Sequence, residues 1–160
     1  MDGTSDGTFE PNSDASRAMI VTMLWRMEGK PVVDYTMTYA DIPEGQWYTE
    51  AVRWASSEGI VDGFDGLAFG PNYSVTREQL AAILYRCATR RGLGFQGAWM
   101  FRLDNPDASS VSEWADEAMH WMVMHGIING MEDGTLNPGG NATRAQVATM
   151  LMRYSIESEE

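Results

Sequence analysis

Three arginines stand at equivalent positions, each directly after a Ser or Thr at the start of an apolar helical pattern: Arg17, Arg77 and Arg144. A guanidinium group is planar, keeps its charge, and can donate two parallel hydrogen bonds to a carboxylate. A helix start already carries about half a positive charge, so a cation there costs roughly a few tenths of a kcal/mol. Three copies of this unfavourable choice predict an anion site formed by guanidinium and helix terminus together. The alternative that these arginines lie over a neighbouring aromatic ring or pair with an acid stays open.

The residues around these arginines predict capped helix starts. Thr76 and Thr143 are suited to accept a hydrogen bond from the backbone N–H three residues later, where Gln79 and Gln146 can reciprocate. In the first copy Ser16 can cap its helix, but the methionine three residues later cannot return the bond. We therefore expect two complete capping boxes and one simple cap.

These helix starts belong to a sequence repeat. Four residues of the first copy recur 60 positions later and again 67 positions after that: Gly3, Pro11, Arg17 and Arg26; Gly63, Pro71, Arg77 and Arg86; Gly130, Pro138, Arg144 and Arg153. Repetition of this length predicts a modular array. The predicted units are a partial repeat over 1–30, which lacks its leading helix, a second repeat over 31–92 and a third over 93–160.

Apolar periodicity predicts an all-α fold of helix–loop–helix repeats with five main helices. Leading helices are expected at Trp47–Glu58 and Trp114–His125, and the others follow the three arginines. Gly59 should end its helix as a left-handed cap, with Ile60 closing a hydrophobic contact over it. Residues 29–45 are expected to be a connector without a partner strand.

Composition limits the classes of function. The chain has 160 residues, 44% of them hydrophobic, and 23 acids against 11 bases give a net charge of −12, which argues against nucleic-acid binding. No apolar run approaches the roughly 20 residues of a membrane span, so membrane insertion is not expected. Cys87 is the only cysteine and falls in an apolar helical pattern, which predicts burial.

Other chemical candidates are weaker. His120 and His125 lack a third ligand at metal spacing, and the Asp-Gly pairs lack the ligand pattern of a calcium loop, so neither a metal nor a cofactor is expected. No nucleophile stands with a base, so no catalytic residue is predicted. Trp54 and Trp121 are expected to pack in the core, whereas their counterparts Trp47 and Trp114 could border a sugar-binding groove.

The repeats resemble S-layer homology (SLH) repeats. The second repeat carries the similarity in these motifs: Asp41-Ile42-Pro43, Trp47-Tyr48-Thr49-Glu50-Ala51-Val52, Gly59-Ile60-Val61-Asp62-Gly63, Phe69-Gly70-Pro71-Asn72 and Val75-Thr76-Arg77-Glu78. The third repeat has their counterparts: Asp107, Trp114-Ala115, Gly126-Ile127-Ile128-Asn129-Gly130, Leu136-Asn137-Pro138 and Ala142-Thr143-Arg144-Ala145. The similarity covers nearly the whole chain.

The resemblance implies a pseudo-threefold helical bundle that anchors an exported protein to the cell wall of Gram-positive and related bacteria. Its implied ligand is an anionic secondary cell-wall polysaccharide, often pyruvylated, bound in grooves between repeats at an extracellular, cell-surface location. The predicted polysaccharide-binding residues are Arg17, Arg77, Arg144, Thr76, Thr143, Trp47, Trp114, Gly63 and Gly130. The chain departs from the family pattern where Met19, Gln79 or Gln146 replaces an acid, and in its incomplete first repeat.

Two further expectations follow from the incomplete repeat. The chain is expected to be a fragment of a longer exported protein, and it is expected to form a homodimer that covers the face left by the absent helix. A helical protein–protein or self-assembly scaffold, with structural arginines and an exposed Met/Trp groove, is the alternative function. An enzymatic activity finds no support in these residues.

Overall fold

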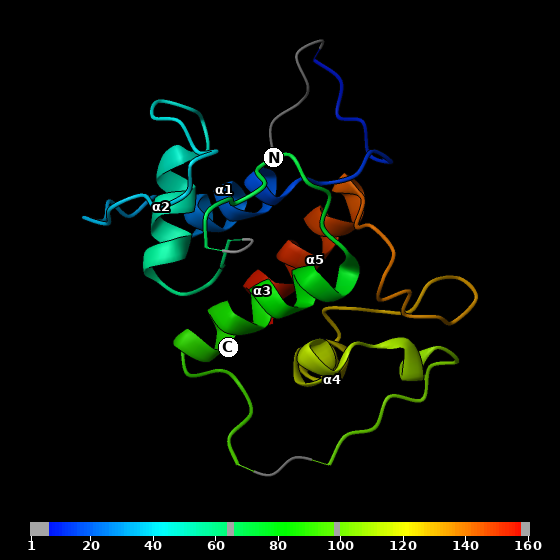
Figure 1. Cartoon of the computed structure of the whole chain (residues 1–160). Helices are drawn as coiled ribbons and strands as arrows, with labels where there is room; N and C mark the ends of the chain where they lie inside the picture. Colours follow the sequence, from blue (N-terminus) through cyan, green and yellow to red (C-terminus); the bar gives the residue numbers. More distant parts are fainter. Residues whose placement is uncertain (1–6, 64–65, 98–99, 158–160) are drawn as a thin grey trace. The chain divides into compact units, whose positions relative to one another are not determined.

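The computed structural model describes residues 7–63, 66–97 and 100–157, and in these ranges the chain is all-helical (Figure 1). Five α-helices and two short 3-10 helices follow one another, and no strand occurs in the described ranges. This confirms the predicted fold class. The chain forms two compact units, one from Asp14–Ser74 with residues 7–10 and one from Pro11–Ser13 with the described residues from Val75 onward.

The first unit is built on helices α1 (Arg17–Met27) and α2 (Thr49–Ser57), which pack against each other (Figure 1). Ile20 and Leu24 of α1 are buried, as are Val52 and Trp54 of α2, so the expected apolar spacing does face a core. After Met27 the chain turns through Gly29 at a φ of 79°, where the sequence predicts the helix to stop.

Each leading helix ends with the same left-handed cap. Gly59 and Gly126 have φ values of 65° and 66°, as expected for glycine just beyond a helix. The following residues are Ile60, which donates its backbone N–H to Ala55 O, and its equivalent Ile127; both isoleucines are buried. The predicted cap and hydrophobic closure are confirmed, and they fix the direction in which the next loop leaves the helix.

The connector over residues 29–45 contains no strand. Tyr39 is buried at its end, and the backbone N–H of Ala40 donates to Leu67 O, so the connector is fastened to the loop that follows α2. This attachment places Asp41 beside that loop.

The second unit contains α3 (Arg77–Arg90), η1 (Ala108–Ser110), η2 (Glu113–Ala115), α4 (Asp116–Met124) and α5 (Arg144–Glu157). Helix α3 packs against α4 and η2, with Leu80, Leu84 and Met119 fully buried. The buried carboxylate of Glu78 accepts hydrogen bonds from the backbone N–H and hydroxyl of Ser112, which holds the start of η2 against α3.

The predicted helix Trp114–His125 is divided in the structure. Its first turn is the 3-10 helix η2, and α4 begins only at Asp116. Trp121 is buried and donates its indole N–H to Leu93 O, and Trp54 is buried in α2, so both core tryptophans were predicted correctly. Cys87 is buried in α3, as expected.

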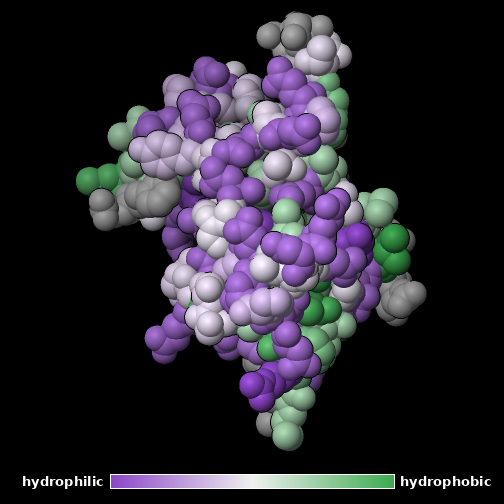
Figure 2. Space-filling view, turned by 90° about the vertical axis from the view of Figure 1, so that its right-hand side faces the viewer, coloured by the Kyte–Doolittle hydropathy of each residue, from purple (hydrophilic) through white to green (hydrophobic). Residues whose placement is uncertain are grey.

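Polar side chains cover most of the surface that Figure 2 shows, and hydrophobic residues there form small separate patches. In the described part of the chain, no helix combines the length and the apolarity needed to cross a membrane.

Candidate functional site

In the first unit, the side chain of Arg17 at the start of α1 binds the backbone of the loop after α2, and we call this set of contacts the Arg17 clasp. The Nε of Arg17 donates to Phe69 O at 2.8 Å, and Nη2 donates to Asp62 O at 2.7 Å. The guanidinium carbon also lies 4.5 Å from the centre of the Phe69 ring, a cation–π distance. The alternative of an arginine over an aromatic ring therefore describes part of this contact.

The second unit repeats the clasp with Arg77. Its Nε donates to Leu136 O at 2.7 Å and its Nη2 to Asn129 O at 3.2 Å, the positions equivalent to Phe69 and Asp62. Arg77 is only 4% exposed, and this burial lowers its pKa from the ordinary value, while the nearby carboxylate of Asp107 acts in the opposite direction. The charge of Arg77 is thus held where water solvates it poorly.

An aspartate holds the same loop from its other side. Asp107 accepts the backbone N–H groups of Leu136 and Asn137, both at 2.7 Å, and Asp41 accepts those of Phe69 and Gly70 at 2.8 and 2.7 Å. The residue that donates its N–H to the aspartate presents its carbonyl to the arginine. One peptide segment therefore links aspartate and arginine, and positions each guanidinium precisely enough for two hydrogen bonds.

The backbone N–H groups at these helix starts are already occupied. Arg77 N donates to Gly140 O at 2.9 Å and Glu78 N to Pro138 O at 3.0 Å, while the next N–H donates to the capping hydroxyl of Thr76. These N–H groups are therefore not free for an external anion. This changes the physical basis of the expected anion site, which must rest on guanidinium groups rather than on the helix terminus.

The third arginine has the same backbone arrangement. Arg144 N donates to Ser13 O at 2.9 Å, Ala145 N donates to Pro11 O at 3.0 Å, and the Arg144 residue is 3% exposed. Thr143 and Gln146 form reciprocal cap bonds, as do Thr76 and Gln79, whereas Ser16 only accepts the N–H of Met19. The predicted two boxes and one simple cap are confirmed.

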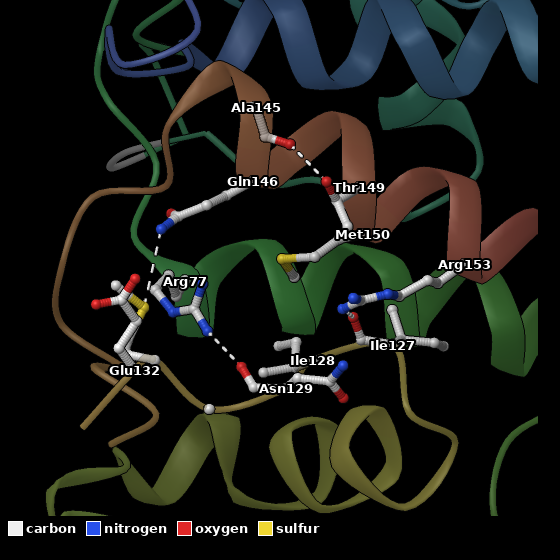
Figure 3. A pocket seen from close by; sticks show the side chains of 12 residues that line it. Arg77, Ile127, Ile128, Asn129, Glu132, Ala145, Gln146, Thr149, Met150 and Arg153 are labelled. Atoms are coloured by element: carbon white, nitrogen blue, oxygen red, sulfur yellow. Dashed lines mark hydrogen bonds between the residues drawn. The ribbon is translucent and has the colours of Figure 1, made fainter. Parts of the chain in front are cut away.

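A groove of about 360 Å³ lies in the second unit between the loop after α4 and helix α5 (Figure 3). This volume falls in the range of small-molecule pockets, roughly 300–1,000 Å³. Its wall combines apolar and polar side chains with two arginines: Arg77, Ile127, Ile128, Asn129, Gly130, Met131, Glu132, Ala145, Gln146, Thr149, Met150 and Arg153.

The two arginines of the groove extend toward each other from α3 and α5, with Asn129 on the loop beside them (Figure 3). Arg153 donates to Ile127 O at 3.4 Å, and with the Asn129 amide oxygen turned toward it, both Nη atoms donate to that oxygen at 3.2 Å. Among the described residues, neither Arg77 nor Arg153 forms an ion pair. Glu132 is the only acid lining this groove.

Arg77 has hydrogen-bonding capacity left. A guanidinium carries five N–H groups, and the contacts of Arg77 with described residues use two of them. The remaining N–H groups belong to a buried, charged side chain on the groove wall, where an unmet charge is costly. The groove is therefore suited chemically to a ligand that supplies anionic oxygens.

The structure brings together only some of the predicted site residues. Arg77 and Gly130 line the groove, and Thr143 caps the helix that forms its far wall. Gly63 lies in the first unit, where an added Cβ would overlap the Tyr39 ring and lie 2.7 Å from Ala68 O. Its glycine identity therefore has a packing reason.

The two tryptophans proposed for sugar contact are exposed. Trp47 is 56% exposed before α2, and Trp114 is 59% exposed in η2, but neither lines the groove. Among the described residues, no group of three His, Cys, Asp or Glu side chains is placed to hold a metal ion.

Sequence reasoning missed Arg153, Asn129 and Glu132 as groove residues. A signal for Arg153 was present, because arginine recurs at this position as Arg26 and Arg86 at the same offsets as the helix-start arginines. No local pattern could show that Arg153 faces Arg77, since the two residues are brought together only by the packing of α3, the loop and α5.

Comparison with known families decides which kind of module this is. The sequence model of the S-layer homology domain matches residues 38–81 and 106–148, more than half of the chain. The chain belongs to the S-layer homology family. The two SLH matches contain Asp41 with Arg77 and Asp107 with Arg144, so these four residues lie within the matched repeats, whereas Arg17 and Arg153 lie outside them.

Relatives of this SLH chain are much longer proteins. It is 33% identical over 94% of its length to an amylopullulanase of Thermoanaerobacterium thermosulfurigenes, and 31% identical over 94% to the exoglucanase XynX of Acetivibrio thermocellus. It is 29% identical over 94% to the surface-layer 125 kDa protein of Lysinibacillus sphaericus. The chain spans only 8%, 14% and 12% of these relatives, respectively.

Proposed function

We propose that this SLH chain binds an anionic cell-wall polysaccharide without catalysis and thereby anchors an exported protein to the bacterial surface. The observation that carries the proposal is the groove with two arginines and no ion pair to either among the described residues. Support also comes from the surface-layer relative and from relatives with enzyme names in which the matched region is a small part.

The charge of the chain favours a sparsely charged glycan over a dense polyanion. A net charge of −12 repels nucleic acid, which carries one charge per roughly 1.7 Å of duplex. A polysaccharide with one carboxylate per repeating unit, such as a pyruvate ketal, can place a single charge beside Arg77 and Arg153 and keep its other groups neutral. The groove's Gln146 and Glu132 then offer polar atoms for sugar hydroxyls, and Met131 and Met150 offer apolar contact.

The other predicted contact residues have different proposed roles, because some line the groove and others lie outside it. Gly130 lines the groove at a place where an added Cβ would lie 3.1 Å from Gly134 O, and Thr143 caps the start of α5. Trp47 and Trp114 are proposed to stack on sugars outside the groove, since both are more than half exposed. Arg17 and Arg144 remain proposed polysaccharide-binding arginines, like Arg77.

Isothermal titration calorimetry with a pyruvylated cell-wall polysaccharide tests this function. Arg153→Ala should lower affinity at least tenfold with little change in stability, because Arg153 is only half-buried and contributes few internal contacts. Arg26→Ala, which removes the arginine at the equivalent position of the first repeat, is the matched control and should bind normally. Equal affinity of wild type for the polysaccharide before and after removal of its ketals would contradict the proposal.

The scaffold alternative and the homodimer stay predictions. Met152 and Ile156 lie one turn apart on α5 and are 56% and 58% exposed, so the described surface does present some apolar area. Light scattering over a wide concentration range tests self-association, and Ile156→Glu should lower the mass if this surface forms the contact. The two functions are separated by the arginines, because a scaffold predicts that their substitution lowers the melting temperature rather than the glycan affinity.

A further inference from the structure

The two clasps differ at one charged position. Asn129 and Asp62 are equivalent, and the main-chain oxygen of each accepts Nη2 of its arginine. This backbone contact needs no particular side chain, so the clasp itself does not explain why one repeat has an amide and the other a carboxylate. The difference between Asp62 and Asn129 must therefore act through contacts of the side chain.

The side chain of Asn129 contacts the second arginine of the groove. With its amide oxygen turned toward Arg153, Asn129 accepts hydrogen bonds from both Nη atoms at 3.2 Å and does not cancel their charge. The Arg153 side chain it holds extends toward Arg77 (Figure 3). An aspartate with the same geometry would form a bidentate ion pair with Arg153. The amide is thus a neutral acceptor at a place where an acid would fit equally well.

The charges on the groove wall show what this neutrality achieves. Arg77, Arg153 and Glu132 are the charged residues lining the groove, so its wall carries one net positive charge in a chain whose net charge is −12. A carboxylate at position 129 would remove that excess. It would also stand beside Arg77, whose Nη2 is bonded to the backbone of the same residue.

We propose that Asn129 determines the charge specificity of the groove by holding Arg153 in place while leaving both guanidinium groups available to one carboxylate of the ligand. This inference rests on the proposed glycan-binding function and assigns its specificity to a residue outside the helix-start arginines. Asn129 acts as a positioning residue for Arg153. The ligand class is a glycan with a compact, singly charged carboxylate substituent.

Asn129→Asp tests the inference directly. It should lower affinity for pyruvylated cell-wall polysaccharide at least tenfold, while Asn129→Ala should lower it less, because alanine removes the orienting bond but adds no charge. Ser109→Asp, which adds the same charge at an exposed residue of η1 outside the groove, is the matched control and should bind like wild type. Circular dichroism confirms that each variant is folded.

Two ligands separate specificity from a general loss of structure. After mild acid removal of the ketals, wild type and Asn129→Asp should bind the polysaccharide equally weakly. Asn129→Asp binding the pyruvylated form as tightly as wild type, or losing no more affinity than Asn129→Ala, overturns the inference.

A second readout keeps the test independent of the polysaccharide. Arginine side-chain NMR signals of Arg77 and Arg153 are followed during titration with sodium acetate against sodium chloride at equal ionic strength. If wild type binds no polysaccharide, the proposed function fails, but an acetate-specific shift in wild type that is absent from Asn129→Asp still supports the role of Asn129. The same shift in both proteins, or in neither, overturns it.

Discussion

The Arg17 clasp and the Arg77 clasp use the same backbone contacts in different surroundings. Arg17 is half-buried and lies over Phe69, and its loop carries the acid Asp62. Arg77 is almost fully buried against Leu136 and reaches a groove whose loop carries an amide. The same arrangement of arginine and loop thus fastens a loop in the first unit, whereas in the second unit it also places unused guanidinium N–H groups beside a groove.

Substitution of the aspartates should lower the free energy of unfolding most, and by similar amounts in the two units if the two clasps are equivalent in structure. Asp107→Ala and Asp41→Ala each remove a carboxylate that accepts two backbone N–H groups, which should lower the free energy of unfolding by about 3 kcal/mol. Urea denaturation followed by circular dichroism measures both. A loss in one repeat that is several times the loss in the other would break the equivalence.

Substitution of the arginines should lower the free energy of unfolding by different amounts in the two clasps. Arg77→Ala leaves two carbonyl groups without their donor beneath a buried side chain and should cost about 2–3 kcal/mol, whereas Arg17→Ala, at a half-buried site, should cost about 1–2 kcal/mol. The same denaturation experiment gives both values. Arg77→Lys is the charge-preserving control and should recover only part of the loss, because lysine cannot make the paired contact. The opposite order of the two alanine variants would contradict the difference in burial.

The ring beneath Arg17 should account for a smaller part of the contrast. Phe69→Leu gives the first clasp the residue type of the second, and should cost about 1 kcal/mol through lost packing and the lost cation–π contact. A double-mutant cycle with Arg17→Ala isolates the ring contact, for which we expect a coupling of about 0.5–1 kcal/mol. Additive losses would show that the ring contributes packing alone.

Removal of the helix caps should give the smallest difference in stability between the two units. Thr76→Ala removes the threonine of a complete capping box and should cost about 1 kcal/mol, while Ser16→Ala, which lacks the reciprocal bond, should cost about 0.5 kcal/mol. Met19→Gln supplies the absent partner and should raise thermal stability slightly. An unchanged melting temperature would mean that the methionine's existing contacts offset the new bond.

Local features of the fold could be predicted well from the sequence. The helix starts at Ser16, Thr76 and Thr143, the left-handed turn at Gly59 and the burial of Trp121 depend on residues within one or two turns of each other. The start of α4 was less accurate. Trp114 and its neighbours satisfy helical spacing, but they form a 3-10 turn fixed by Ser112, whose partner Glu78 lies 34 residues earlier.

The candidate site could be predicted only in part. Arg77 was identified because its charge conflicts with the helix start, and this is a local argument. The partners of its guanidinium could not be identified, since Leu136 and Asn129 lie 59 and 52 residues away. Arg153 was visible as a repeated residue, yet its position opposite Arg77 depends on packing that no residue pattern reports.

The sequence by itself determined the helical repeats, their caps, the family and the presence of a misplaced positive charge at each helix start, because these depend on short-range periodicity and residue chemistry. Only the tertiary structure decided that neighbouring carbonyl groups occupy the helix-start N–H groups, which leaves guanidinium groups as the available donors. It also decided that Arg77 and Arg153 share one groove with Asn129. The reason is physical: desolvation and charge pairing depend on which groups surround a side chain, and those groups come from distant parts of the chain.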